Sequence, residues 1–360
     1  MEICKIPPST QRKMNFEFFS HDLGVDLGTS NVLIYKADSG IIVREPSVVA
    51  MDKNTGKALQ IGAAARNMLG RTPGNVVAMH PLKDGVVADH DMTVTMLQKF
   101  FRSVGSSSIF KPKPRVVVSV PCSVTQMDER AVINAAIEAG ARRVYLIEEP
   151  LAAALGAGLD LNGNTGHMVV DIGGGTTNIA VLTQNAVATS ASIKVAGDAF
   201  DDAIGRYVRR RHGVVIGKVT AEEIKIKIGC VDERAEEVTM TVRGRDAKSG
   251  MPRELTLSSA DIYEVLRRLA RTIADEVMSV LEDTSPELVS DIAENGITLT
   301  GGGSQLWGMA ELIQGRTGIR CTLADDPDSC VVYGCGKSLS WINHMKEGPI
   351  NIARKRIMRQ

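Results

Sequence analysis

Two glycine turns of the same design organise this sequence. One reads Asp-Ile-Gly-Gly-Gly-Thr-Thr-Asn at residues 171–178, and a shorter one reads Asp-Leu-Gly-Thr-Ser-Asn at residues 26–31. Each follows an apolar run that is typical of a strand, and each leads into a second, β-branched run. Glycine lets the backbone turn tightly, and successive exposed N–H groups form a concavity that binds anions. Two such hairpins facing each other would grip a polyphosphate from both sides.

The side chains of both turns favour a polyphosphate that carries magnesium. Asp26 and Asp171 end their strands, where they would hold the water molecules of a Mg²⁺ ion that bridges the phosphates. Backbone N–H groups and hydroxyls would donate to the phosphate oxygens. The predicted phosphate-binding residues are Gly28, Thr29, Ser30, Asn31, Gly173, Gly174, Gly175, Thr176 and Thr177. A single Asp-x-Gly turn usually has no binding function, so the prediction of a phosphate site depends on the presence of two such turns in matching contexts.

The composition excludes some classes of protein. The 360 residues include 42 basic and 42 acidic side chains, and this zero net charge argues against broad electrostatic binding to nucleic acid. Aromatic residues make up 4% of the chain and glycines number 34, which favours a glycine-turned α/β protein over a β-sandwich. The six cysteines form no C-x-x-C pair, as is typical of free thiols in a reducing compartment.

The N-terminal segment and the apolar runs bear on location. Residues 1–20 contain two prolines and several charges in place of the apolar core of a secretory signal. No apolar run approaches the roughly 18 residues of a transmembrane helix. We therefore expect a cytoplasmic protein.

The expected elements repeat in the same order along the chain. In the first half, strands are expected at 23–26, 32–36, 41–44, 48–51, 115–121 and 143–147, and helices at 92–101, 124–140 and 151–158. In the second half, strands are expected at 168–171, 179–182, 190–193 and 296–300, and helices at 220–228, 260–281 and 306–315. This order predicts an α/β fold of two duplicated βββαβα domains joined around a cleft.

The predicted domain boundaries follow from that repeat. Residues 1–20 form a tail. The first domain covers residues 21–164, with a small insertion at about 52–90, and a C-terminal segment at about 340–360 completes it. The second domain covers residues 165–339, with a β-rich insertion at about 205–258.

Glu149 is the predicted general base. It closes a strand directly before a helix that starts with proline, so its carboxylate can point into the cleft and orient water for attack on a terminal phosphate. Such catalysis contributes roughly 10²- to 10⁴-fold in rate. The alternative is an acidic residue that the helix dipole favours at a helix start.

Three further groups are candidates for the rest of a nucleotide. Gly301, Gly302 and Gly303 form a third glycine turn, suited to a base or a ribose. Glu222 and Lys225 share one helix face and would reach ribose hydroxyls, or form a solvated pair. Gly197 and Asp198 precede a helix, where they would offer N–H groups to phosphate or simply cap that helix.

Two apolar segments are candidates for membrane contact. Phe16, Phe18 and Phe19 stand near cations in the tail, as in an interfacial helix, and the alternative is a disordered or strand-like extension. Ile109 and Phe110 form an apolar pair in a loop of serines and prolines.

Together these motifs resemble the actin/Hsp70/sugar-kinase ATPase superfamily, and within it the MreB/Mbl family of bacterial actin homologues. The superfamily motifs are the two turns, Glu-Glu-Pro-Leu-Ala-Ala-Ala at 148–154, Ala-Gly-Asp-Ala-Phe-Asp at 196–201 and Thr-Gly-Gly-Gly at 300–303. The family-specific runs are Glu-Pro-Ser-Val-Val-Ala at 45–50, Arg-Thr-Pro-Gly-Asn at 71–75, Pro-Leu-Lys-Asp-Gly-Val at 81–86, Ala-Glu-Glu-Ile-Lys at 221–225 and Pro-Glu-Leu-Val-Ser-Asp-Ile at 286–292. The resemblance covers about residues 22–342.

The resemblance implies an actin-like ATPase that uses ATP and Mg²⁺ and hydrolyses ATP slowly as it polymerises. It implies a homopolymer of paired protofilaments at the inner face of the cell membrane, with the cell-wall elongation machinery as partner, a role in rod shape, and no nucleic acid. Glu149 and Thr176 are then catalytic, Glu222 and Lys225 contact the ribose, and residues 301–303 contact the adenosine. The membrane candidates lie where some family members carry an inserting loop or an amphipathic helix.

Alternatives and departures accompany this resemblance. A chaperone-type ATPase or a small-molecule kinase of the same fold is the alternative function, and neither is expected to sediment with ATP in the absence of substrate. Asn178 stands where an acidic residue is usual. The basic residues Arg354, Lys355, Arg356 and Arg359 have no clear family counterpart.

Overall fold

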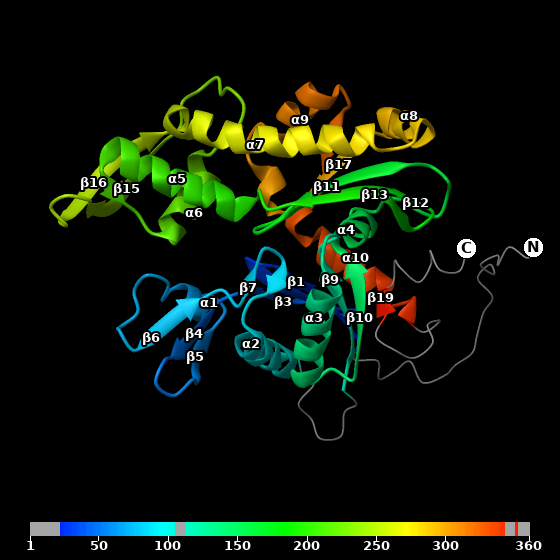
Figure 1. The fold of residues 1–360 in the computed structure, drawn as a ribbon, viewed down its shortest axis with the longest axis horizontal. Coiled ribbons are helices and arrows are strands. Elements are labelled where there is room, and N and C mark those ends of the chain that lie inside the picture. Colours follow the sequence, from blue (N-terminus) through cyan, green and yellow to red (C-terminus); the bar gives the residue numbers. More distant parts are fainter. Residues whose placement is uncertain (1–21, 105–112, 343–349, 352–360) are drawn as a thin grey trace, which may run out of the picture.

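The computed structural model describes residues 22–104, 113–342 and 350–351. Its two main sheets lie one above the other, with a helix layer between them (Figure 1). The first sheet has the strand order β19-β10-β9-β1-β2-β3, and the second has the order β13-β12-β11-β17-β18. In each sheet an antiparallel meander continues into parallel strands, as the repeated order predicts.

The first sheet is built around the shorter glycine turn. Its strands are β1 (Leu23–Leu27), β2 (Asn31–Lys36), β3 (Gly40–Pro46), β9 (Arg115–Val120), β10 (Arg143–Glu148) and β19 (Ile350–Asn351). Helices α2 (His90–Ser103) and α3 (Gln126–Glu138) pack on one face, where their apolar residues join a core with β1, β2 and β9. Thr125 and Asp128 form a reciprocal capping box that starts α3.

The second sheet is built around the longer turn. Its strands are β11 (His167–Ile172), β12 (Thr177–Thr183), β13 (Ala186–Ile193), β17 (Ile297–Thr300) and β18 (Cys321–Leu323). Helices α5 (Gly197–His212), α7 (Ser259–Glu282), α8 (Pro286–Asn295) and α9 (Met309–Thr317) contribute to the core on its outer face. The 24-residue α7 begins at a second capping box, made by Ser258 and Asp261.

Helices α4 (Glu149–Gly156) and α10 (Cys330–Ser338) form the layer between the sheets (Figure 1). Their side chains share one core with Val117 and Tyr145 of the first sheet and with Val169 and Ala180 of the second. Residues far apart in the sequence therefore join the two halves at this helix pair.

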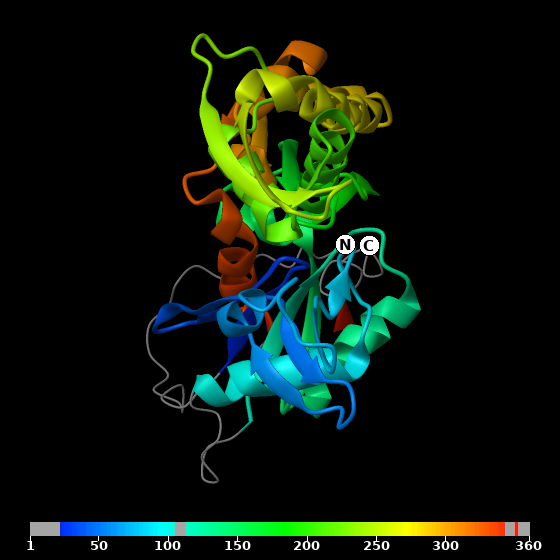
Figure 2. The same ribbon diagram turned by 90° about the vertical axis from the view of Figure 1, so that its left-hand side faces the viewer.

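Two smaller units extend from the main sheets on the same side of the molecule (Figures 1 and 2). One contains β4 (Val49–Asp52), β5 (Ala58–Ile61), α1 (Ala63–Arg66) and β6 (Val76–Met79), with the hairpin of β7 (Leu82–Lys83) and β8 (Val86–Val87) beside it. The other contains β14 (Val214–Val215), α6 (Lys218–Ile228), β15 (Thr239–Asp246) and β16 (Pro252–Ser258). Short 3₁₀ turns, η2 (Gly302–Gln305) and η3 (Pro327–Ser329), complete the cleft side.

Some expectations needed correction. Residues 48–51 were expected as a fourth strand of the first meander, but β4 pairs with β5 and β6 in a separate sheet. The meander ends at Pro46, and a tight turn closed by the Val48 N–H, which donates to Pro46 O at 2.8 Å, separates β3 from β4. Helix α8 was not predicted as a helix. The domain boundaries stay a prediction.

Phe16, Phe18, Phe19, Ile109 and Phe110 all lie outside the described residues. Within the described ranges, no helix combines the length and apolar character that a membrane crossing requires.

Candidate functional site

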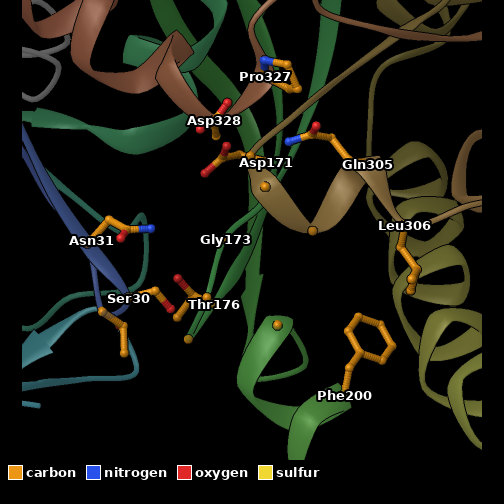
Figure 3. Close-up of a pocket in the computed structure, with 18 of the residues that line it drawn as sticks. Ser30, Asn31, Asp171, Gly173, Thr176, Phe200, Gln305, Leu306, Pro327 and Asp328 are labelled. Carbon is orange, nitrogen blue, oxygen red and sulfur yellow. The ribbon is translucent and has the colours of Figure 1, made fainter. Parts of the chain in front are cut away.

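The two glycine turns line one cavity of about 560 Å³. That volume lies within the usual range of small-molecule sites, roughly 300 to 1,000 Å³. Figure 3 shows Ser30 and Asn31 reaching it from the first half, and Asp171, Gly173 and Thr176 from the second. The predicted residues that line the cavity are Asp26, Gly28, Thr29, Ser30, Asn31, Glu149, Asp171, Gly173, Gly174, Gly175, Thr176, Gly197, Glu222, Lys225, Gly301, Gly302 and Gly303.

The turns approach each other closely enough to require glycine. A Cβ atom on Gly174 would lie 2.0 Å from Ser30 Oγ, and one on Gly175 would lie 2.6 Å from Thr29 Oγ1. The first turn is held from behind, since Ser47 Oγ donates to Gly28 O at 2.6 Å and Gly85 N donates to Thr29 Oγ1 at 3.0 Å. The paired turns are therefore a preformed concavity.

The start of α5 supports the second turn. The Gly197 N–H donates to Gly173 O at 3.1 Å, and the Asp198 N–H donates to Gly174 O at 2.8 Å. The expectation that these N–H groups meet phosphate is therefore wrong for this structure. Gly197 still lines the cavity, whereas Asp198 does not.

Thr177 also lies outside the cavity. Its side chain is fully buried, and its hydroxyl donates to Val195 O at 2.7 Å. The predicted contact of this hydroxyl with phosphate is wrong because the strand alternation turns it to the other face of β12. Thr176 keeps its place in the cavity wall.

Three acidic side chains converge on the floor of the cavity. Burial and the Asp171 carboxylate raise the pKa of Asp26 to about 7, although Ser119 Oγ donates to it. Burial raises the pKa of Asp171 to about 6, against a hydrogen bond from Thr300 Oγ1 at 2.8 Å. Burial, Asp171 and Asp26 raise the pKa of Glu149 well above its ordinary value. A cation nearby would relieve this repulsion.

This acidic floor fits Mg²⁺ held through water. Mg²⁺ takes oxygen ligands and keeps several of its own water molecules. Across the described residues, no group of three or more His, Cys, Asp or Glu side chains is close enough to hold an ion directly. Asp26 and Asp171 both line the cavity, where they would hold such an ion through its water molecules; this role stays a prediction.

Glu222 and Lys225 line the cavity from α6, and each has a partner in another element. Glu222 is paired with Arg66 of α1. Lys225 Nζ lies 2.9 Å from Asp201 Oδ1 and donates to Gly197 O at 3.1 Å. The alternative of a solvated pair is thus wrong, because both side chains contact neighbouring elements.

The third glycine turn is pressed against the end of β11. A Cβ atom on Gly301, whose φ is +80°, would lie 2.3 Å from Ile172 O, and one on Gly303 would lie 2.5 Å from Ile172 Cγ2. Ile172 directly follows Asp171 on β11, so these contacts place residues 301–303 in the cavity wall beside Asp171.

The apolar end of the cavity was not predicted from the sequence. Phe200, Ile226, Leu306 and Trp307 line it, together with Arg234, whose guanidinium carbon lies 4.9 Å from the centre of the Trp307 ring. Figure 3 shows Phe200 and Leu306 at this end. The available signal would have been Trp307, one of two tryptophans in the chain, four residues after Gly303. Flat apolar and cationic groups of this kind suit an aromatic base.

Ion pairs that the sequence analysis did not predict cross the cleft. Lys194 Nζ lies 3.2 Å from Asp84 Oδ2, Arg66 pairs with Glu222, and Arg44 pairs with Asp328. Each joins a residue of the first half to one of the second. The two halves are therefore in contact around the cavity.

We expect the ligand-free protein to lose stability as the pH rises from about 4 to about 7. The raised pKa values of Asp26, Asp171 and Glu149 mean that the folded state binds these protons more tightly than the unfolded state. Their contribution is therefore complete below the unfolded pKa and is lost as the pH rises through the folded values. Asp26→Asn removes one repelling carboxylate, so at pH 8 the variant should be more stable than the unsubstituted protein by about 1 to 3 kcal/mol.

Differential scanning calorimetry without nucleotide or divalent cation measures this effect. At pH 4, where the carboxyls are largely protonated, the two proteins should unfold at similar temperatures. A difference of the same size at both pH values would mean that the repulsion is not its cause.

The family profile described as MreB/Mbl protein matches residues 20–347. The cell shape-determining protein MreB of Escherichia coli (strain K12) is 49% identical over 329 residues, which cover 90% of this chain and 95% of that protein. The cell shape-determining protein Mbl of Bacillus subtilis (strain 168) is 46% identical over 321 residues, covering 89% and 96%.

Solved structures have the same fold. MreB 5 of Spiroplasma citri bound to AMPPNP has a TM-score of 0.85 at 37% identity, covering 89% of this chain and 96% of that one. A chain from a MamK double helical filament has a TM-score of 0.74 at 22% identity, covering 90% and 99%. The second likeness shows the fold alone.

Proposed function

The chain belongs to the MreB/Mbl family, and we propose that it binds ATP with Mg²⁺, hydrolyses it slowly and polymerises into membrane-associated filaments that help to set rod cell shape. The observation that carries this proposal is the cavity in which the two glycine turns face each other above three carboxylates. Solved relatives bound to AMPPNP and to ADP support an adenine nucleotide as the ligand.

Different residues of the cavity bind the phosphates, the ribose and the base of the nucleotide. The paired turns take the phosphates, with backbone N–H groups and the hydroxyls of Thr29, Ser30 and Thr176 as donors. Glu222 and Lys225 take the ribose, and the third glycine turn with Leu306 and Trp307 takes the base. Mg²⁺, held by Asp26 and Asp171 through water, supplies positive charge to the phosphates when bound.

Hydrolysis depends on Glu149 in this proposal. Glu149 is 7% exposed and lines the cavity, and its carboxylate orients a water molecule towards the terminal phosphate and takes up its proton. Thr176, from the opposite turn, donates to the phosphate oxygens.

Polymerisation and membrane contact complete the proposal. Control of cell shape needs a structure larger than one subunit, and a polymer of this chain supplies it. Membrane contact rests on the sequence of Phe16, Phe18, Phe19, Ile109 and Phe110. Burying a phenylalanine is worth about 1.5 to 3 kcal/mol, so one subunit binds weakly, whereas a polymer that presents many copies binds tightly. The cytoplasmic face of the membrane and the cell-wall elongation machinery are the proposed partners.

Sedimentation tests the proposal. With Mg²⁺ and ATP and no other substrate, most of the protein is expected in the pellet as filaments visible by electron microscopy, and little is expected there with EDTA. A chaperone-type ATPase or a small-molecule kinase would stay in the supernatant. A protein that remains monomeric with ATP, Mg²⁺ and lipid vesicles would contradict the filament function.

Vesicle flotation separates the membrane part from the rest. Filaments should float with anionic vesicles, and replacing Phe16, Phe18 and Phe19 together with Ile109 and Phe110 by serine should reduce flotation without reducing sedimentation in the absence of lipid. Unchanged flotation of that variant would remove these residues as membrane anchors.

A further inference from the structure

Asn178 occupies a position from which it reaches the base of the proposed reaction. It stands on β12 directly opposite Asp171 on β11. Successive side chains of a strand point to opposite faces. Ile179 and Val181 pack into the outer core, whereas Ala180 and Leu182 pack into the core shared with α4. Asn178 shares the face of Ala180 and is therefore directed at α4.

The contact at the start of α4 is a hydrogen bond to Glu149. Asn178 Nδ2 donates to Glu149 Oε2 at 2.5 Å, and the Asn178 side chain is fully buried. The negative charges of Asp171 and Asp26 raise the pKa of Glu149, whereas the hydrogen bond from the Asn178 amide lowers it. The amide thus stabilises the carboxylate in the form that can accept a proton.

The other end of the amide is unsatisfied. Asn178 Oδ1 is buried and has no hydrogen-bond partner among the residues that the structure describes. Leaving a buried polar atom without a partner costs about 1 to 3 kcal/mol. An apolar residue would avoid that cost on a strand whose next four residues, 179–182, are apolar. The cost is consistent with a functional reason for an amide here.

We propose that Asn178 is a positioning residue for ATP hydrolysis, which holds the Glu149 carboxylate in its reactive orientation through the Nδ2–Oε2 hydrogen bond. This inference rests on the proposed ATPase function. Asn178 does not line the cavity, so it acts through Glu149 and not on the nucleotide. A displacement of about 1 Å in a catalytic group costs about 10²-fold in rate, and loss of this hydrogen bond frees the carboxylate to rotate.

The test is a double-mutant cycle between positions 178 and 149. Asn178→Leu keeps the branched shape and the four heavy atoms of the side chain and removes the donor. Its rate of phosphate release at saturating ATP should fall by about 10- to 100-fold, while the dissociation constant for ATP, measured by calorimetry, should change less than about twofold. In a Glu149→Ala background the same substitution should change the residual rate by less than about twofold, because the group that it positions is absent.

Two results would overturn the proposal. One is an equal loss of rate from Asn178→Leu in both backgrounds. The other is a loss of ATP affinity that matches the loss of rate, which would indicate general damage to the cavity. Asn178→Ser, whose side chain is too short to reach the carboxylate, is the second variant and should show the same pattern if the leucine variant folds poorly.

A measurement without nucleotide distinguishes this inference from the proposed function. Asn178→Leu should lower the midpoint of thermal unfolding at pH 8 when Glu149 is present and lower it much less when Glu149 is alanine. If the unsubstituted protein shows no ATP hydrolysis, the proposed function fails and Asn178 has no positioning role. If hydrolysis is present but neither the rates nor the midpoints couple, the Asn178 inference alone fails.

Discussion

Replacing Glu149 with alanine is expected to slow phosphate release from ATP by about 10²- to 10⁴-fold, the usual contribution of a general base. Glu149 is the first residue of α4, directly after β10, and its carboxylate lies in the cavity wall. It belongs to neither glycine turn, so the donors proposed for the phosphates remain. ATP binding should therefore persist, and filaments should still form with ATP and last longer than those of the unsubstituted protein.

Steady-state phosphate release and calorimetric ATP binding measure the two halves of this expectation. Glu148→Ala is the matched control, because Glu148 is the adjacent acidic residue and does not line the cavity. Its rate should stay within about threefold of normal, a change of under about 1 kcal/mol in the barrier, because the Glu148 side chain does not reach the cavity. Unchanged turnover in Glu149→Ala would remove this side chain from the mechanism.

Much of the site could be predicted because its determinants are local. A strand that ends in Asp, a glycine turn and a hydroxyl pair follow one another within eight residues, so the chemistry of each turn is visible in the sequence. The repeated order of strands and helices then places the two turns at equivalent positions of two similar units. The predicted family and the actin-like fold are confirmed by the family match and by the solved relatives.

The remaining features depend on contacts between distant residues. The N–H groups of Gly197 and Asp198 donate to the second glycine turn because that turn lies beside the start of α5. The sequence near α5 does not show that the turn lies there. Arg234 and Trp307 meet across 73 residues, so their pairing has no local signal. Asn178 could be identified as a departure from the family pattern, but its hydrogen bond to Glu149 required the packing of β12 against α4.

The second large effect is expected at the helix pair between the sheets. Gly334 of α10 lies against α4, where a Cβ atom would stand 1.8 Å from the backbone oxygen of Ala152. Gly156 of α4 makes the reciprocal approach, with a Cβ position 1.7 Å from Cys330 O. Real Cβ atoms do not come within 3.0 Å of such atoms, and backbone cannot move away as a flexible side chain can. The two helices are therefore packed as closely as glycine allows.

Gly334→Ala should lower the free energy of unfolding by about 3 kcal/mol, the upper end of the usual cost of overpacking. The substitution must separate α10 from α4, and α4 begins at Glu149, so the helix start that carries the proposed base should move as well. We therefore expect ATP hydrolysis to fall even at temperatures where the variant stays folded. Thermal unfolding and phosphate release measured on the same preparation follow both effects.

Gly205→Ala provides the matched control, because Gly205 lies within α5 and a Cβ atom there meets nothing within 4 Å. Alanine in an open helical position stabilises by roughly 0.5 to 1 kcal/mol relative to glycine, so this control should unfold at the same or a slightly higher temperature. If Gly334→Ala behaved in the same way, α4 and α10 would have to tolerate separation without cost. The tight helix pair would then not be what holds the two halves, and with them the two glycine turns, in register.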